Sequence, residues 1–281
     1  MLKTKSNYWA KMAFVASFAI LTSCSEDEEK KTETEADLIE QTKMSSDVDA
    51  VADDIMFIIE NEYSNQSSAG RSPQGTQDFL PECATVTSTV TGGNWEATID
   101  FGTTGCAMPN GNILKGIIAI TGTTDFAALS QTINYSFENF YHNNRLVQGD
   151  RYVVRQLENS NDNPQSTIEL DLSVTFPNGA VVTREGNRVW EWIEGVETIF
   201  NPLDNIYLVT GEWITVFPDN SLSTEITSAL RILGTCNHIV EGTINFSTNS
   251  NALVLDYGNG TCDSEATVSI NGAEAATINL N

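Results

Sequence analysis

Residues 168–176 have the sequence Ile168-Glu169-Leu170-Asp171-Leu172-Ser173-Val174-Thr175-Phe176, with an apolar side chain at every even position and a polar one at every odd position. Successive side chains of a β-strand point to opposite faces, so this stretch predicts a strand with one buried face and one solvated face. The chain continues through Pro177-Asn178-Gly179 into Val181-Val182-Thr183. Because Pro presets φ and Asn-Gly tolerates positive φ, this segment predicts a β-hairpin.

The same pattern recurs from Cys83 to the C-terminus. A second hairpin is predicted around Pro218-Asp219-Asn220, and residues 95–101 and 133–137 alternate in the same way. Turn residues recur at short intervals and no long helical pattern interrupts them, which predicts about twelve strands. We therefore expect residues 81–281 to form an all-β domain, either a large antiparallel β-sandwich or an open β-barrel.

Composition limits the classes of function. The chain has 281 residues, of which 40% are hydrophobic and 9% aromatic, enough for a substantial core. It carries 38 acidic and 14 basic side chains, a net charge of −24 at pH 7. Nucleic acids are bound through clustered Lys and Arg, so no nucleic-acid partner is expected.

The N-terminus has the pattern of an export signal. Lys3, Lys5 and Lys11 precede the apolar run at residues 12–21, and Leu21-Thr22-Ser23-Cys24 follows. A run of ten residues is shorter than the roughly 20 that a membrane-spanning helix needs. Residues 1–23 are therefore predicted to be a signal peptide rather than a transmembrane anchor.

The tetrad at residues 21–24 resembles the bacterial lipobox, which implies lipid attachment at Cys24 and a membrane anchor; the alternative is an ordinary secretory signal with an incidental cysteine. The following residues, Ser25 to Lys31, resemble the export signal of surface lipoproteins in Bacteroidota. That resemblance implies display on the outside of the outer membrane. The alternative is a charged tether of a lipoprotein that faces the periplasm.

The region between the anchor and the β domain divides into three segments. Residues 24–36 predict an acidic disordered tether, 37–63 an amphipathic helix and 64–80 a flexible Ser/Gln/Gly-rich linker. The helix is predicted from apolar side chains at three- and four-residue steps: Met44, Val48, Val51, Ile55 and Ile58. Acidic side chains are expected on its other faces: Asp47, Asp53, Asp54 and Glu60. The apolar stripe favours packing on the chain's own sheet, with a partner helix or a membrane surface as alternatives.

Four cysteines remain once Cys24 is assigned to lipid, and an even number in an oxidising compartment predicts disulfides. Cys83 and Cys106 flank one predicted hairpin, and Cys236 and Cys262 flank another. The second strand of each ends alike, in Asp100-Phe-Gly-Thr-Thr-Gly-Cys106 and in Asp256-Tyr-Gly-Asn-Gly-Thr-Cys262. This similarity predicts an internal duplication with one local disulfide in each unit. Each disulfide would contribute about 3–4 kcal/mol to the free energy of unfolding. The two other connectivities of four cysteines stay open.

Alternative roles for these residues have less support. No Cys-x-x-Cys pair is present, which argues against a metal or redox site. Asp100 and Asp256 could bind a cation, but an Asp just before a Gly more often forms a turn.

Catalytic motifs are absent from the sequence. His238 is expected on the buried face of a strand, and His142 in a solvent-exposed turn. No His-Glu-x-x-His, Gly-x4-Gly-Lys or Gly-x-Ser-x-Gly occurs. We therefore predict no catalytic residue, no metal and no cofactor.

The one suggestive cluster is aromatic. Trp190 and Trp192 fall on one side of a strand with Arg188, and Trp213 could adjoin them. Exposed tryptophans could stack on sugars, but core packing is the commoner role of large aromatics. Glu191 and Glu194 give a weak basis for a glycoside hydrolase.

The β region also resembles a group of uncharacterised flavobacterial lipoproteins, through Ile99-Asp-Phe-Gly102, Phe176-Pro-Asn-Gly179, Trp192-Ile-Glu-Gly195 and residues 255–263. That resemblance implies an extracytoplasmic β domain and no known activity. We expect a non-enzymatic outer-membrane lipoprotein on the cell surface, with a structural role or a glycan or protein ligand. The alternatives are a periplasm-facing carrier of lipid or another apolar ligand, and a glycoside hydrolase.

Overall fold

The computed structural model describes residues 34–68, 80–198 and 201–280. The predicted signal peptide, Cys24, nearly all of the predicted tether and most of the predicted linker lie outside these residues. The described part contains one α-helix, two short 3₁₀-helices and fifteen strands.

The elements follow one another in this order: α1 (Glu35–Ser68), β1 (Thr85–Thr91), β2 (Asn94–Asp100), β3 (Cys106–Ala107), β4 (Ile113–Thr123), β5 (Ser130–His142), β6 (Arg145–Gln148), β7 (Asp150–Gln156), β8 (Gln165–Thr175), β9 (Val181–Glu194), η1 (Val196–Thr198), η2 (Pro202–Asp204), β10 (Ile206–Val216), β11 (Ser221–Leu233), β12 (Glu241–Ser247), β13 (Ala252–Asn259), β14 (Glu265–Ile270) and β15 (Ala276–Asn279).

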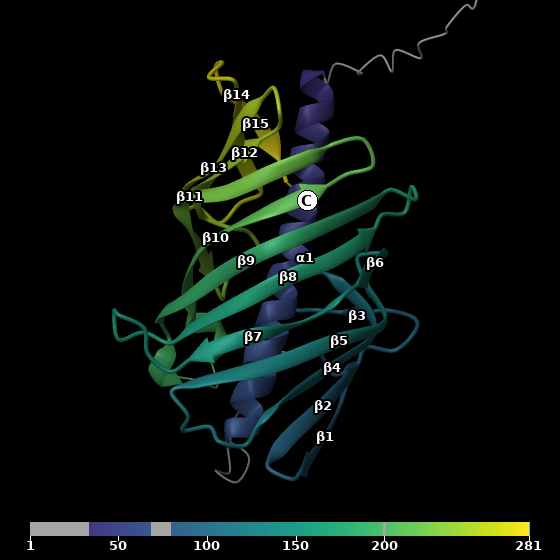
Figure 1. Cartoon of the computed structure of the whole chain (residues 1–281), viewed down its shortest axis with the longest axis vertical. Helices are drawn as coiled ribbons and strands as arrows, with labels where there is room; N and C mark the ends of the chain where they lie inside the picture. The colour runs from purple at the N-terminus through teal and green to yellow at the C-terminus, as the bar shows by residue number, and fades with distance from the viewer. Residues whose placement is uncertain (1–33, 69–79, 199–200, 281) are drawn as a thin grey trace, which may run out of the picture. The chain divides into compact units, whose positions relative to one another are not determined.

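All fifteen strands belong to one antiparallel sheet (Figure 1). The order along its main path is β1-β2-β4-β5-β6-β8-β9-β10-β11-β12-β13-β14-β15, while β3 pairs with β4, and β7 pairs with β5 and β8. Neighbours in space are therefore almost always neighbours in sequence, and β1 and β15 form the two edges. The all-β prediction is confirmed. The strands beyond the twelve expected are mostly short ones, such as β3 and β6, which are too brief to show alternation.

The predicted hairpins are formed. In β8 the even-numbered residues Ile168, Leu170, Leu172 and Val174 are buried, as the alternation indicates. The Phe176 amide donates to Ala180 O across the turn that contains Gly179, whose φ is 87°. The Phe217 amide donates to Asn220 O in the second hairpin. Local turn chemistry thus sets the register of both strand pairs.

The internal duplication is also present. Cys83 is bonded to Cys106 and Cys236 to Cys262, so each bridge lies within its own unit as predicted. Asp100 Oδ1 accepts from the Gly102 amide, and Asp256 Oδ1 accepts from the Gly258 amide. Both aspartates therefore form turns. The two units occupy opposite ends of the sheet, as β1-β2-β4 and as β12-β13-β14.

Helix α1 packs on one face of the sheet, here called the inner face, and runs behind the strands in Figure 1. It begins with a capping box, in which the Asp37 amide donates to Thr34 Oγ1 and the Thr34 amide donates to Asp37 Oδ2. It ends at Ser68, beyond the predicted end at residue 63. Gln66 donates to Glu62 Oε1 one turn back, a contact that helps to carry the helix into the predicted linker.

The predicted single apolar stripe is wrong. Adjacent residues such as Ile55 and Met56, and Ile58 and Ile59, are all buried, which places core contacts on several sides of α1. Asp49, Asp54 and Glu60 are only 1%, 4% and 9% exposed. A helix buried on most of its circumference no longer needs a purely polar second face, provided that its charges find partners.

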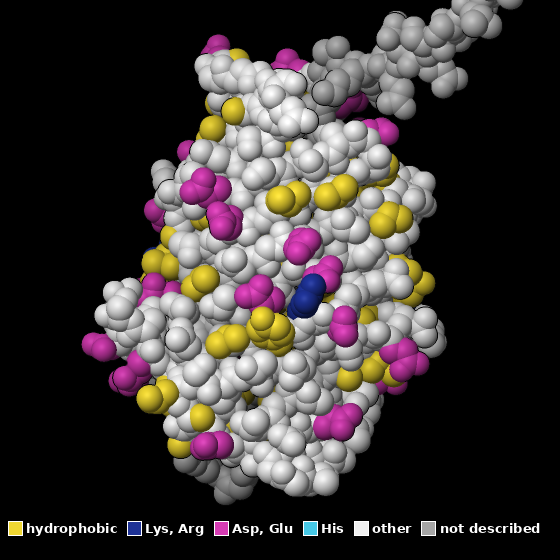
Figure 2. Space-filling model, in the orientation of Figure 1, with side chains coloured by type: hydrophobic (Ala, Val, Ile, Leu, Met, Phe, Trp, Pro, Cys, Tyr) yellow, Lys and Arg dark blue, Asp and Glu magenta, His cyan; other side chains and the backbone are white. Residues whose placement is uncertain are grey.

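The opposite, outer face of the sheet is seen in Figure 2. Acidic side chains are scattered over it, together with isolated apolar ones and very little Lys or Arg. Within the described residues no helix combines the length and apolar content needed to cross a membrane.

Candidate functional site

A row of ion pairs joins α1 to the inner face of the sheet, and we call it the ionic seam. Each pair joins an acidic residue of the helix to a basic residue of a strand: Asp54–His142 (2.8 Å), Asp47–Arg145 (2.7 Å), Glu60–Arg155 (3.2 Å), Asp49–Arg184 and Asp53–Arg188 (2.6 Å). The strand residues occupy inward-facing positions that would otherwise be apolar. Helix acids are therefore the counter-charges that make these positions tolerable.

Arg184 is the best satisfied member of the seam. Its guanidinium pairs with Asp49 and donates to Ser45 Oγ at 2.7 Å, Ser45 O at 3.0 Å and Thr215 Oγ1 at 3.2 Å. Burial lowers the pKa of Arg184, and the Asp49 carboxylate opposes that effect. Its Cζ lies 4.9 Å from the Trp213 ring centroid. Arg184 therefore fixes both α1 and Trp213 to β9.

Arg188 is less well satisfied. Its Nη1 lies 2.6 Å from Asp53 Oδ1 and 3.8 Å from Asp49 Oδ1, yet none of its N–H groups is aligned into a hydrogen bond with a described residue. Burial raises the pKa of Asp53 to about 7; Arg188 opposes this, and Asp49 and Asp54 add to it. Asp53 therefore changes charge near neutral pH, in a site where its counter-ion cannot move into water.

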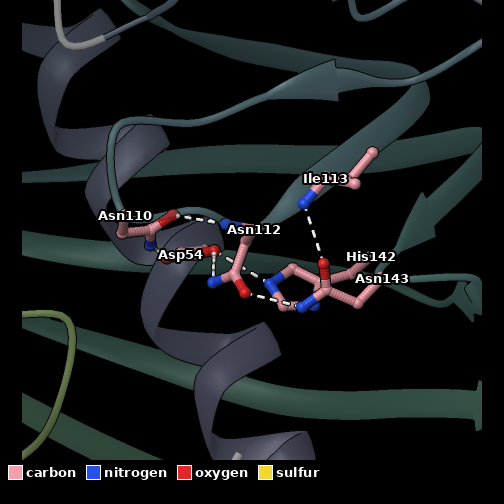
Figure 3. Close-up of polar contacts among 6 residues, drawn as sticks. All are labelled: Asp54, Asn110, Asn112, Ile113, His142 and Asn143. Carbon is pink, nitrogen blue, oxygen red and sulfur yellow. Dashed lines mark hydrogen bonds and ion pairs between the residues drawn. The ribbon is translucent and has the colours of Figure 1, made fainter.

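Asp54 is the centre of a cluster of amides (Figure 3). Its carboxylate accepts from Asn110 Nδ2 at 2.6 Å, Asn112 Nδ2 at 2.7 Å and His142 Nε2 at 2.8 Å. Asn143 then donates to Asn112 Oδ1 and accepts from the Ile113 amide. The cluster ties α1 to the loop between β3 and β4 and to the end of β5.

The prediction of a solvent-exposed His142 is wrong, because this residue is only 1% exposed. It is the last residue of β5 and shares the inward face with Phe140, and the turn begins one residue later, at Asn143. His142 Nε2 lies 2.8 Å from Asp54 Oδ2, and His142 Nδ1 is buried with no described partner.

A cavity of about 90 Å³ lies beside Asp49, Asp53 and Asp54, between α1 and the C-terminal strands. Its remaining polar lining comes from α1, the β3–β4 loop, the segment before β12, β13, and the segment that leads into β14: Ser46, Asn110, Asn112, Asn237, His238, Tyr257, Asp263, Ser264 and Glu265. His238 was expected on a buried strand face, but it is half-buried and faces this cavity. The reason is that β12 begins only at Glu241, so the alternation does not extend back to His238.

Three residues that line the cavity carry a buried oxygen atom without a described donor. Asp49 Oδ2 is buried with no hydrogen-bond partner among the described residues. The hydroxyls of Ser46 and Tyr257 have at most each other as partner, and Tyr257 is 6% exposed. Burial raises the pKa of Tyr257, so the phenol keeps its proton. The site thus offers carboxylate and hydroxyl oxygens that lack donors, an arrangement suited to N–H groups of a cation.

A metal ion fits this lining less well than an organic cation. The described part of the chain contains no group of three or more His, Cys, Asp and Glu residues arranged to hold a metal. The three carboxylates that α1 contributes to the cavity are also each bound to a strand or loop residue: Asp49 to Arg184, Asp53 to Arg188, and Asp54 to two amides and His142.

The three tryptophans do not form an exposed platform. Trp190, Trp192 and Trp213 are 2%, 5% and 3% exposed, and Trp190 packs edge-on against Phe57 of α1 with ring centroids 5.4 Å apart. The core-packing alternative holds because β9 and β10 lie under the helix. Gly186 is required there, since a Cβ at this position would lie 2.6 Å from Trp213 Cβ.

The two glutamates noted for glycoside hydrolysis have separate structural partners. Glu191 accepts from Asn161 and Asn163 Nδ2, both at 2.9 Å, and these hydrogen bonds lower its pKa. Glu194 lies 3.6 Å from Arg231, and its side chain is 60% exposed. A glycosidase acid needs a raised pKa, so Glu191 is poorly suited to that role.

Comparisons with models of protein families, with curated proteins and with solved structures found no match. The function is therefore argued from the site alone.

Proposed function

We propose that this chain is a lipid-anchored outer-membrane protein with a binding role, and that the cavity beside α1 takes the ammonium group of a small organic amine. The observation that supports the proposal is the set of buried, donor-deficient oxygens around this cavity, above all Asp49 Oδ2 and the Tyr257 hydroxyl. The anchor and its location rest on the Lys3–Cys24 pattern and on the acidic residues that follow it.

The size of the cavity sets the class of ligand. About 90 Å³ holds roughly three water molecules, well below the about 300 Å³ where drug-sized pockets begin. An ammonium group on a short alkyl stem fits, with the rest of the ligand in solvent. A whole sugar ring or a lipid chain does not fit inside.

The earlier alternatives have less support. A carrier of an apolar ligand would need the inner face of the sheet, which α1 occupies with side chains such as Ile55 and Ile58. A glycan would need exposed aromatic surface, which the buried tryptophans do not provide. A protein ligand that inserts a lysine side chain is compatible with the same cavity.

The experiment is a calorimetric titration of the purified chain with n-butylamine at pH 8, compared with 1-butanol of the same stem. We expect butylammonium to bind and butanol not to bind. Tyr257→Phe, which removes one buried hydroxyl, should weaken binding by about tenfold or more. Equal heats for amine and alcohol, or an unchanged affinity in this variant, would refute the proposal.

A matched pair of variants separates the cavity from general charge. Glu265→Gln removes one negative charge at the cavity, and Glu212→Gln removes one from β10, outside its lining. The first should weaken butylamine binding and the second should not. Equal weakening by both would mean that only the net charge of −24 attracts the amine.

A further inference from the structure

Strand β1 leaves one edge of the sheet open. It pairs with β2 on one side, and no described residue forms a hydrogen bond with the backbone of its other side. Every residue of β1 is exposed, including Val86 at 42% and Val90 at 64%. Their cross-strand neighbours Ile99 and Trp95 are 0% and 1% exposed, so the two valines continue the buried face outward into solvent.

In the second unit, β12-β13-β14, the strand that corresponds to β1 has a further neighbouring strand, which β1 lacks. The two units align on Asp100 and Asp256, so the pair Val86–Ile99 corresponds to Ile244–Leu255. Ile244 is 0% exposed because β12 has a further neighbour, β11, which places Ile226 opposite it. The first unit has the same hairpin without that neighbouring strand.

The sequence of β1 is a palindrome. Thr-Val-Thr-Ser-Thr-Val-Thr, from Thr85 to Thr91, is the same in both directions. Antiparallel pairing of two such strands about Ser88 would place each Val86 opposite a Val90 and each Ser88 opposite its counterpart. All Val–Val and Thr–Thr pairs would then form at once, and two-fold symmetry would close the assembly.

The edge at β1 is free of the charge that keeps copies apart elsewhere. The chain has a net charge of −24, so two copies repel one another over most of their surface. β1 contains no charged residue and no Pro, the usual features that prevent edge strands from pairing. The nearest acids in the sheet, Glu96 and Asp100, lie one strand further back on β2.

We infer that two copies of this chain associate through antiparallel β1–β1 pairing centred on Ser88. A pair of seven-residue strands buries well under the roughly 1,200 Å² of standard interfaces, so the dimer is weak and depends on concentration. This inference does not rest on the proposed ligand, and a chain that binds no amine would still dimerise.

Cysteine cross-linking tests the register in the full chain carrying Cys24→Ser, so that the introduced thiol is the only unpaired one. Directly opposite residues have Cα atoms about 4.5–5.5 Å apart, within the range of a disulfide. Ser88→Cys should therefore give a covalent dimer under mild oxidation, whereas Thr87→Cys should not, because its counterpart lies diagonally at about 7–8 Å. A Ser88→Cys chain that stays monomeric at the highest soluble concentration would overturn the inference.

A mixing experiment adds a second check. Val86→Cys and Val90→Cys should each form no covalent dimer alone and should cross-link when mixed. Cross-linking of either variant alone as fast as the mixture would indicate random collision and refute the register. Sedimentation of the Cys24→Ser chain should show both monomer and dimer. Ser88→Lys should lower the dimer fraction at least tenfold, because it places two positive charges opposite each other. Species larger than a dimer would contradict the inference and would indicate β1–β15 pairing between copies.

Discussion

At the scale of single residues, the pair Asp53–Arg188 is the weak point of the ionic seam. Arg184 has hydrogen bonds from each of its nitrogens, whereas Arg188, at 0% exposure, has ion-pair contacts and lies over the rings of Trp190 and Trp213 but has no aligned hydrogen bond to a described residue. A buried guanidinium without aligned acceptors recovers less of its lost hydration. The same shortage explains why burial outweighs Arg188 and raises the pKa of Asp53.

This raised pKa predicts a pH-dependent stability. Asp53 has a pKa of about 7 in the folded chain, against 3.8 for an ordinary Asp side chain, so between these pH values the folded state holds a proton that the unfolded state has lost. Its ionisation therefore costs stability progressively from about pH 4 to pH 7, and the whole cost is present above pH 7. Asp53→Asn removes that cost. We expect its Tm, relative to the native chain, to rise from pH 5 to about pH 7 and to level off above that pH, in thermal unfolding followed by circular dichroism. Glu225→Gln serves as the control, and parallel Tm curves for native and Asp53→Asn chains would contradict the assignment.

At the scale of elements, α1 is held by partners rather than by an amphipathic pattern. Its apolar side chains are buried on several sides, and its acids are neutralised one by one by basic residues of β5, β6, β7 and β9. A buried ion pair contributes little net stability compared with apolar residues, but the loss of one partner is costly. The seam therefore specifies the position of the helix along the sheet more than it stabilises the fold.

The pair Asp49–Arg184 allows a direct test of this view. Arg184→Met leaves the Asp49 carboxylate buried without its partner and should cost about 3–5 kcal/mol in the free energy of unfolding. The double variant Arg184→Met, Asp49→Leu should recover most of that loss, measured by urea denaturation. Arg151→Met breaks the exposed Arg151–Asp171 pair and should cost less than about 1 kcal/mol. A double variant as unstable as Arg184→Met alone would show that the seam itself carries the stability.

At the scale of the whole molecule, the distribution of charge follows from the seam. Four arginines, Arg145, Arg155, Arg184 and Arg188, face the helix, out of only 14 basic residues in the chain. The outer face is left with acidic side chains and almost no counter-charge (Figure 2). Such a surface is repelled by anionic lipid headgroups, so this face does not favour contact with an anionic membrane.

The location of the β domain can be tested on intact cells. If the proposed surface display holds, proteinase K added outside should degrade the tagged chain while a periplasmic protein stays intact. Cells with a permeabilised outer membrane show that the protease can cut both proteins. Protection of the chain until permeabilisation would place it on the periplasmic side.

The strands, hairpins and disulfide pairs could be predicted because each depends on local sequence. Alternation places Ile168 and Leu170 on one face wherever the strand packs, and the repeated segments that end at Cys106 and Cys262 mark two self-contained units. The existence of α1 was also predictable from its apolar spacing. Its C-terminal end was not, because Ser64 to Ser68 are polar and carry no periodicity.

The site could not be predicted in this way, because its members are distant in sequence. Asp54 and His142 are 88 positions apart, and Ser45 and Arg184 are 139 apart, so no local pattern pairs them. One signal was available: Arg184 and Arg188 share the inward face of a strand with Trp190, and a buried cation requires a buried acid. Which acidic residue pairs with each arginine depends on how α1 lies across the sheet. The sequence by itself specifies an all-β, disulfide-linked domain, through period-two alternation and turn chemistry. The packing of one helix against that sheet specifies the ionic seam, the burial of His142 and the cavity. The reason is that only tertiary contact brings these opposite charges together.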